Sequence, residues 1–225
     1  MPAIPLVSLS RARSASPSML VRLLLVLFAC VASPVYGASP PIVLVVGDSI
    51  SAGYGLAPGE VWVAGLESKL AGERHPHRVV NASISGDTTA GGRARLPALL
   101  KQHRPAVVII ELGGNDALRG QPLAATRENL DAMVLAAQGA GAKVLIAGMK
   151  LPPNYGPVYV RAFDSLFGEV AKLRKTAFVP YLFEGFGDDL AWFQSDRIHP
   201  TAQAQARMLD TVWPALRPLL GALRK

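Results

Sequence analysis

Short apolar runs rich in β-branched residues alternate with longer amphipathic segments along this chain, and this alternation limits the fold more than any other feature. Residues 42–46 (Ile-Val-Leu-Val-Val) are apolar without interruption, which is typical of a parallel strand buried on both faces. Similar runs lie at residues 78–80, 106–112, 143–147 and 177–180. Helix-like segments lie at residues 61–71, 89–103, 123–138, 158–175 and 201–219. This order predicts an α/β fold, a three-layer α/β/α sandwich around a five-stranded parallel sheet, with reactive groups at the carboxyl ends of the strands.

The N-terminal segment differs from the rest of the chain and has the pattern of a signal peptide. Three arginines precede or enter the apolar run at residues 23–31, and the first acidic residue is Asp48. The run is too short to span a bilayer, and small residues typical of a cleavage site follow it. We therefore expect cleavage of residues 1–37, export to the periplasm or the medium, and a single domain over residues 38–225.

Cys30 is the only cysteine of the chain, and it lies inside this leader. The domain that follows therefore has no disulfide, and its stability depends on its hydrophobic core. Residues 27–30 (Leu-Phe-Ala-Cys) also resemble the lipid-attachment signal of bacterial lipoproteins, although Phe28 is unusual there. A lipoprotein anchored through Cys30 is the alternative. Met19 stands just before the apolar run and is an alternative to Met1 as the start of translation.

The charge of the chain argues against nucleic acid as a partner. The formal net charge is +7, of which the leader arginines supply three, so residues 38–225 carry +4. Their basic side chains are dispersed and are not interleaved with aromatic residues, as a solvated surface would be. This charge is compatible with transient attraction to an anionic membrane surface.

Two features that resemble cofactor sites are incomplete. His75 and His77 supply too few ligands for a metal site. The glycine-rich segment at residues 47–53 lacks both the lysine of a phosphate-binding loop and the spacing of a dinucleotide-binding loop. We therefore expect neither a metal nor another cofactor.

A candidate nucleophile follows the first predicted strand directly. Ser49 ends the motif Gly47-Asp48-Ser49, on the loop where an open α/β sheet places its reactive groups. A serine hydroxyl requires a base within hydrogen-bond reach, and the base requires a carboxylate that holds its tautomer. Of the four histidines, His199 stands three residues after Asp196, a spacing that lets the carboxylate face the imidazole across a turn. Ser49, His199 and Asp196 are therefore the candidate catalytic residues.

Two further loops offer N–H groups to the oxyanion of a tetrahedral intermediate. Gly86 follows the second predicted strand and Asn115 follows the third, so both lie at the same edge of the sheet as Ser49. Gly86 can present its backbone N–H, and Asn115 can present its side-chain amide. Since the loss of one such donor lowers the rate about a hundredfold or more, these residues are part of the candidate site.

Together these motifs resemble the four sequence blocks of the SGNH (GDSL) hydrolases. The blocks are Gly47-Asp48-Ser49, Gly86, Gly113-Gly114-Asn115-Asp116 and Asp196-Arg197-Ile198-His199-Pro200. The resemblance covers nearly all of residues 38–225 and is strongest to the periplasmic group of thioesterases, lysophospholipases and arylesterases. It implies a flavodoxin-like fold and hydrolysis of small or lipid-like acyl esters and thioesters through an acyl-enzyme intermediate, without a metal or other cofactor.

The resemblance also implies roles for individual residues. The oxyanion hole would consist of the backbone N–H groups of Ser49 and Gly86 and the side-chain amide of Asn115. Ala117 and Gln121 depart from the pattern of the group, in a loop that adjusts to the acyl chain, so the chain-length preference stays open. The substrate contacts expected from the resemblance are Leu118, Arg119, Pro153, Tyr155 and Ile198.

Two other functions stay open on the sequence. The motifs define the reaction and not the alcohol, so a carbohydrate or peptidoglycan O-acetylesterase is an alternative on the same scaffold. A non-catalytic binding module is an alternative of another class, because each motif by itself is a common turn or helix cap. The occurrence of all four motifs in order after successive strands favours catalysis. The physiological substrate and the oligomeric state stay undetermined.

Overall fold

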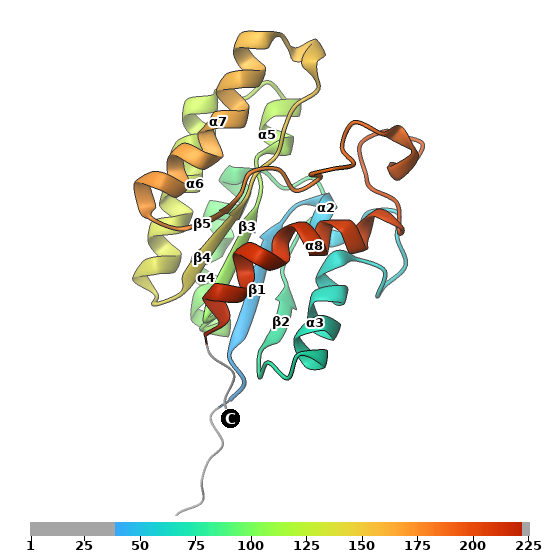
Figure 1. The fold of residues 1–225 in the computed structure, drawn as a ribbon. Helices are drawn as coiled ribbons and strands as arrows, with labels where there is room; N and C mark the ends of the chain where they lie inside the picture. Colours follow the sequence, from blue (N-terminus) through green and yellow to red (C-terminus); the bar gives the residue numbers. More distant parts are fainter. Residues whose placement is uncertain (1–38, 222–225) are drawn as a thin grey trace, which may run out of the picture. The chain divides into compact units, whose positions relative to one another are not determined.

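The apolar runs form the strands of one parallel sheet in the computed structural model, which describes residues 39–221 (Figure 1). The strands are β1 (Ile42–Gly47), β2 (Arg78–Asn81), β3 (Val107–Glu111), β4 (Lys143–Ala147) and β5 (Ala177–Val179). Their order in the sheet is β2-β1-β3-β4-β5, and each neighbouring pair is parallel. The order reverses between β1 and β3, and such a reversal opens a crevice for a ligand at the carboxyl ends of the strands. The predicted five-stranded parallel sheet is confirmed.

Helices cover both faces of this sheet (Figure 1). One face packs against α3 (Trp62–Gly72) and α8 (Ala204–Leu216), and the other packs against α4 (Thr89–His103), α6 (Leu123–Gly139) and α7 (Pro157–Arg174). Side chains alternate along a strand, so Val43 and Val45 of β1 contact the first pair of helices while Leu44 and Val46 contact the second group. All four are fully buried. An uninterrupted apolar run therefore marks a strand that is covered on both sides.

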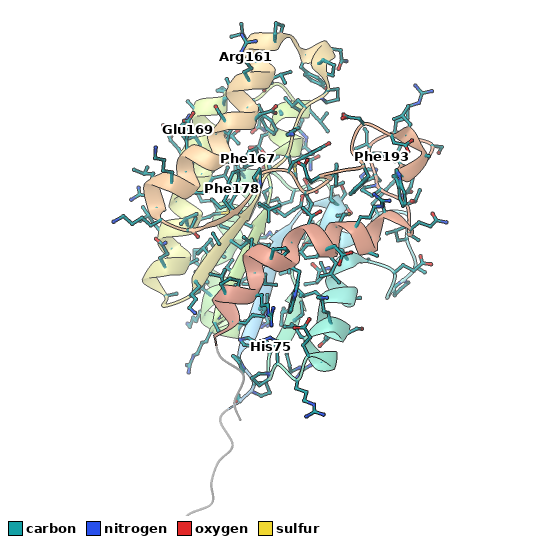
Figure 2. All side chains as sticks on the ribbon, viewed as in Figure 1. His75, Arg161, Phe167, Glu169, Phe178 and Phe193 are labelled. Carbon is teal, nitrogen blue, oxygen red and sulfur yellow. The ribbon has the colours of Figure 1, made fainter. Side chains whose placement is uncertain are left out.

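The side chains of the second face form a continuous aromatic and aliphatic core. Figure 2 labels Phe167 on α7 and Phe178 on β5, which belong to this core. Phe163 meets Phe167 edge to face, with ring centroids 5.1 Å apart, a favourable geometry for two aromatic rings. Both rings lie on α7, and their burial in this core together with side chains of β3 and β4 holds the helix against the sheet.

Several short elements follow the strands and differ from the predicted pattern. They are α2 (Ser49–Ala52), α5 (Gly114–Leu118), η1 (Pro153–Tyr155) and η2 (Leu190–Trp192). One turn contains too few residues to show a periodicity, so the sequence did not indicate them. The helix predicted at residues 201–219 begins at Ala204, after a turn, and continues into η3 (Arg217–Leu220).

The predicted signal peptide, Cys30 and both candidate start residues lie outside the described residues. Among the helices of residues 39–221, none is long and apolar enough to cross a membrane.

Candidate active site

Ser49 begins α2 directly after β1, and Asp48 caps this short helix. The Ile50 N–H donates to the Asp48 carboxylate at 3.0 Å, which fixes the turn that presents the serine hydroxyl. His199 lies on the loop between β5 and α8, 150 residues further along the chain. Its Nε2 atom is 2.9 Å from the Ser49 Oγ, and its Nδ1 atom is 2.7 Å from Asp196 Oδ2. This chain of contacts can remove the serine proton and hold the imidazole in one tautomer.

A tight turn brings Asp196 to the imidazole. Asp196 Oδ1 accepts the N–H groups of Ile198 at 2.9 Å and of His199 at 3.0 Å, and Arg197 between them has a φ of 61°, in the left-handed region. Desolvation raises the pKa of Asp196, but the N–H groups of His199 and Ile198 and the imidazole outweigh it and lower the pKa to about 2. The carboxylate is therefore ionised at every pH at which a histidine base is neutral.

The three predicted oxyanion donors lie around one cavity, which Ser49, Gly86 and Asn115 all line. Gly86 adopts a φ of 78°, and within residues 39–221 its N–H donates to no protein acceptor. Its carbonyl accepts a hydrogen bond from Arg119 Nη2 at 2.8 Å. Asn115 Nδ2 donates to Asp48 Oδ2 at 3.0 Å, which leaves the second N–H of the amide for another acceptor. The arrangement can stabilise negative charge beside the serine hydroxyl.

A buried pair of carboxyl groups lies beneath Ser49. Burial raises the pKa of Asp48 to about 6, although hydrogen bonds from Ile50 and Asn115 oppose the shift. Glu111, at the end of β3, is fully buried, and burial together with the charge of Asp48 raises its pKa well above the usual range. Its Oε2 atom accepts the Ser51 hydroxyl at 2.6 Å and the Asp48 N–H at 3.3 Å. Burial thus favours the protonated form of Glu111, whose carboxyl group holds the loop that carries Ser49 through Ser51 and the Asp48 N–H.

A cavity of about 1150 Å³ opens on Ser49. Of the predicted substrate contacts, Leu118, Pro153 and Ile198 line it. Arg119 and Tyr155 are not part of the lining: Arg119 reaches back to the carbonyl of Gly86, and Tyr155 is 38% exposed on η1. Since pockets for drug-sized ligands measure roughly 300–1000 Å³, the cavity has room for an acyl group and a leaving group together.

Sequence reasoning missed two parts of this cavity. Most of residues 181–190, after β5, line it, and they bring Phe183 and Leu190 to the site. Tyr54, after α2, packs on the base, with its ring centroid 4.4 Å from that of His199. The sequence offered one signal for these segments, which is their position along the chain. Residues 181–190 follow β5, and Tyr54 follows the turn after β1, and an α/β sheet places its site after the carboxyl ends of its strands.

The pair His75 and His77 lies away from this site. Figure 2 shows His75 at the opposite end of the domain from Phe193, which lies on the loop that carries His199. The two imidazole centroids are 6.0 Å apart. In the part of the chain that the structure describes, no group of three or more His, Cys, Asp and Glu side chains is placed to hold a metal ion.

Known proteins are similar to this chain in sequence and in fold. The GDSL-like Lipase/Acylhydrolase family matches residues 45–207. Esterase TesA of Pseudomonas aeruginosa is 55% identical over 183 residues, which are 81% of this chain and 91% of that protein. Thioesterase 1/protease 1/lysophospholipase L1 of Escherichia coli is 40% identical over 184 residues, 82% of this chain and 87% of that protein. A crystal structure of TesA superposes with a TM-score of 0.78 at 56% identity, covering 79% of this chain and 99% of that one.

Proposed function

The chain belongs to the GDSL-like Lipase/Acylhydrolase family and is a carboxylic ester hydrolase, and we propose that it acts through an acyl-enzyme intermediate on Ser49. The observation that carries this proposal is the chain of contacts from Ser49 Oγ to His199 Nε2 at 2.9 Å and from His199 Nδ1 to Asp196 at 2.7 Å. A hydroxyl, an imidazole and a carboxylate in this order are what nucleophilic attack on an ester requires.

The reaction runs in two halves that use the same groups. His199 Nε2 takes the proton of Ser49 as Oγ bonds to the carbonyl carbon, and the imidazolium then protonates the leaving alcohol or thiol as the ester bond breaks. A water molecule then gives a proton to His199 as its oxygen bonds to the acyl carbon, and the imidazolium returns this proton to Ser49 Oγ as the bond between Oγ and the acyl carbon breaks and the acid leaves. Asp196, ionised with a pKa of about 2, stabilises the imidazolium in both halves.

The negative charge of each tetrahedral intermediate falls on the former carbonyl oxygen. We assign its stabilisation to the N–H groups of Ser49 and Gly86 and the amide of Asn115, which line the same cavity. Arg119 holds the carbonyl of the Gly86–Asp87 peptide and so restrains the loop that carries the Gly86 N–H before substrate enters. The mechanism requires no metal and no cofactor.

The substrate is a small ester, and we infer a lipid-like acyl group. Four large hydrophobic side chains of the cavity wall remain substantially exposed, as a site that receives an apolar ligand requires. They are Tyr54, Leu118, Leu190 and Ile198. Relatives are named esterase, thioesterase/lysophospholipase and arylesterase. These names support aryl esters, lysophospholipids and thioesters as substrate classes, and we propose acyl-CoA-like thioesters among the last. The same exposed side chains favour transient contact with a membrane surface, and nothing in the site favours nucleic acid.

The place of action that we propose is outside the cytoplasm. Residues 1–37 have the composition of a cleaved signal peptide, which leaves residues 38–225 as a single catalytic domain in the periplasm or the medium. A lipoprotein anchored through Cys30 is the alternative. Mass spectrometry of the protein purified from cells distinguishes the two, because a mature chain that begins after residue 30 excludes the anchor.

A substrate panel on protein lacking residues 1–37 tests the proposal. We expect hydrolysis of a short-chain aryl ester and of a long-chain acyl-CoA, and loss of both activities in Ser49→Ala. Preference for an acetylated sugar over both would support an O-acetylesterase instead. Failure of a fluorophosphonate probe to label Ser49, together with no turnover of any ester, would support a non-catalytic binding module.

A further inference from the structure

The nucleophile and the base lie on loops that are joined by few hydrogen bonds. Within the described chain, two side-chain hydrogen bonds connect residues 48–56 with residues 190–201. One is the catalytic contact between Ser49 and His199. The other is made by Gln194, whose Nε2 atom donates to the Tyr54 carbonyl at 2.8 Å.

Gln194 completes a hydrogen-bonded path from one loop to the other. The Tyr54 N–H donates to the Ser49 carbonyl at 3.1 Å, and the Tyr54 carbonyl accepts the Gln194 amide. The same Nε2 atom donates to the Pro200 carbonyl at 3.2 Å, and the Gln194 backbone N–H donates to the His199 carbonyl at 2.7 Å. Gln194 therefore bonds to the backbone of the base loop directly and to the Ser49 segment through Tyr54, without touching the reacting atoms.

We propose, on the basis of the function proposed above, that Gln194 is a positioning residue that holds His199 within hydrogen-bond reach of Ser49. The imidazole must accept a proton from the hydroxyl and then deliver it to the leaving group. The distance between His199 Nε2 and Ser49 Oγ must therefore be kept in both protonation states of the imidazole. A misplacement of about 1 Å can reduce the rate about a hundredfold. A neutral amide fixes the loops without adding a charge beside the imidazolium.

The surroundings of Gln194 are shaped to receive this side chain. Gly55 adopts a φ of 74°, and a Cβ atom at this position would overlap with the Gln194 Oε1. The amide thus packs against the one residue type that leaves room for it. Just before Gly55, the ring of Tyr54 packs on the imidazole of His199 with centroids 4.4 Å apart. By holding the Tyr54 carbonyl, Gln194 also fixes the backbone that carries this ring.

The fold of the base loop does not depend on the Gln194 side chain. Phe193 and Pro200 form an antiparallel bridge, and the Thr201 N–H donates to the Trp192 carbonyl at 2.8 Å. These backbone contacts close the loop whatever side chain stands at position 194. The side-chain amide therefore sets the distance between the two loops. Its removal should lower kcat much more than it lowers the free energy of unfolding.

The test replaces Gln194 by Met, which has similar length and no donor, and uses Ser195→Ala, an exposed neighbour, as the matched control. With an activated aryl ester, we expect Gln194→Met to lower kcat by about ten- to a hundredfold with KM within about twofold of the wild-type value. Labelling of Ser49 by a p-nitrophenyl phosphonate should slow by the same factor. Ser195→Ala should match the wild type, and the Tm of both variants should stay within a few degrees of it. If Gln194→Met does not fold, Gln194→Asn replaces it, because its amide is too short by one methylene to join the loops.

A double-mutant cycle separates positioning from other roles. In the His199→Ala background, Gln194→Met should change the residual rate by less than about twofold, because Gln194 acts through the imidazole. An equal loss in both backgrounds, or a wild-type kcat and labelling rate in Gln194→Met, would overturn the inference. Retention of full activity in His199→Ala itself would instead refute the proposed function.

Discussion

Replacement of Asn115 by Ala tests whether its amide stabilises the oxyanion or only supports a turn. The side chain has two amide hydrogens, and one of them is donated to Asp48 Oδ2 at 3.0 Å. The change removes this hydrogen bond and the second N–H that we assign to the oxyanion. The two losses have different consequences, because the first acts on the folded state and the second acts on the transition state.

The magnitudes of the two effects are well separated. Loss of one oxyanion donor lowers kcat by about 10²–10³, equivalent to roughly 2.7–4 kcal/mol of activation free energy. The stability lost with the hydrogen bond to Asp48 is limited, because this carboxyl group, with a pKa of about 6, can take up a proton instead. At pH 7 its protonation costs on the order of 1 kcal/mol, so we expect a stability loss of about 1–2 kcal/mol. In a domain of this size that corresponds to a fall in Tm of about 3–6 °C.

The assay measures both quantities on one preparation. Steady-state kinetics with an aryl ester at pH 7 and 25 °C should show kcat reduced at least a hundredfold and KM changed little, since the donor acts mainly on charge that appears in the transition state. Calorimetry should show a Tm within about 6 °C of the wild-type value. A kcat within about threefold of wild type, with a lowered Tm, would refute the assignment and leave Asn115 as a turn residue.

Four other substitutions give three separate tests. Ser49→Ala should abolish ester turnover and leave the Tm within about 2 °C of wild type, and full activity in this variant would disprove the mechanism. The pKa of Asp48 is raised from 3.8 to about 6 in the folded protein, so the stability that its protonation provides is complete below about pH 3.8 and is lost as the pH rises through 6. In urea denaturation, the free energy of unfolding of Asp48→Asn relative to wild type should therefore be higher at pH 7 than at pH 4, by on the order of a few kcal/mol, while an equal difference at both pH values would contradict the shift. Gly92→Ala should lower the free energy of unfolding by about 1–3 kcal/mol, because the added methyl group overlaps with Leu112. Gly139→Ala should raise it by up to about 1 kcal/mol, because no atom lies near its Cβ position. Denaturation curves that reverse this order would show that the packing around Gly92 is wrong.

The sequence predicted the sheet and most helices because their signals are local. Residues 42–46 are apolar without a break since β1 is covered on both faces, and the same physical cause gave the other strands. The contact between Asp196 and His199 was also predictable, because three residues and one turn join them. The pairing of Ser49 with His199 was expected from chemistry, since a serine nucleophile requires a histidine base. Strand order alone does not give it, because β3 and β4 lie between β1 and β5.

The parts of the site that the sequence did not indicate depend on contacts between distant segments. Glu111 stands at the end of an apolar strand, and only the structure shows that Ser51 and the Asp48 N–H surround its carboxyl group. Residues 181–190 have no periodicity and no motif, and their place in the cavity depends on how the chain leaves β5. Gln194 has a role only because the Tyr54 carbonyl lies opposite its amide, 140 residues away in sequence.

Ser49 should carry the covalent intermediate, and the residue that a phosphonate modifies reveals whether it does. The protein is treated with a p-nitrophenyl alkyl phosphonate until activity is lost, and intact mass and peptide mapping then locate the adduct. We expect one phosphonyl group per chain, on the peptide that contains Ser49, in proportion to the loss of activity, and no adduct in Ser49→Ala. Inactivation with the adduct on another residue, or full activity with Ser49 completely modified, would show that Ser49 is not the nucleophile.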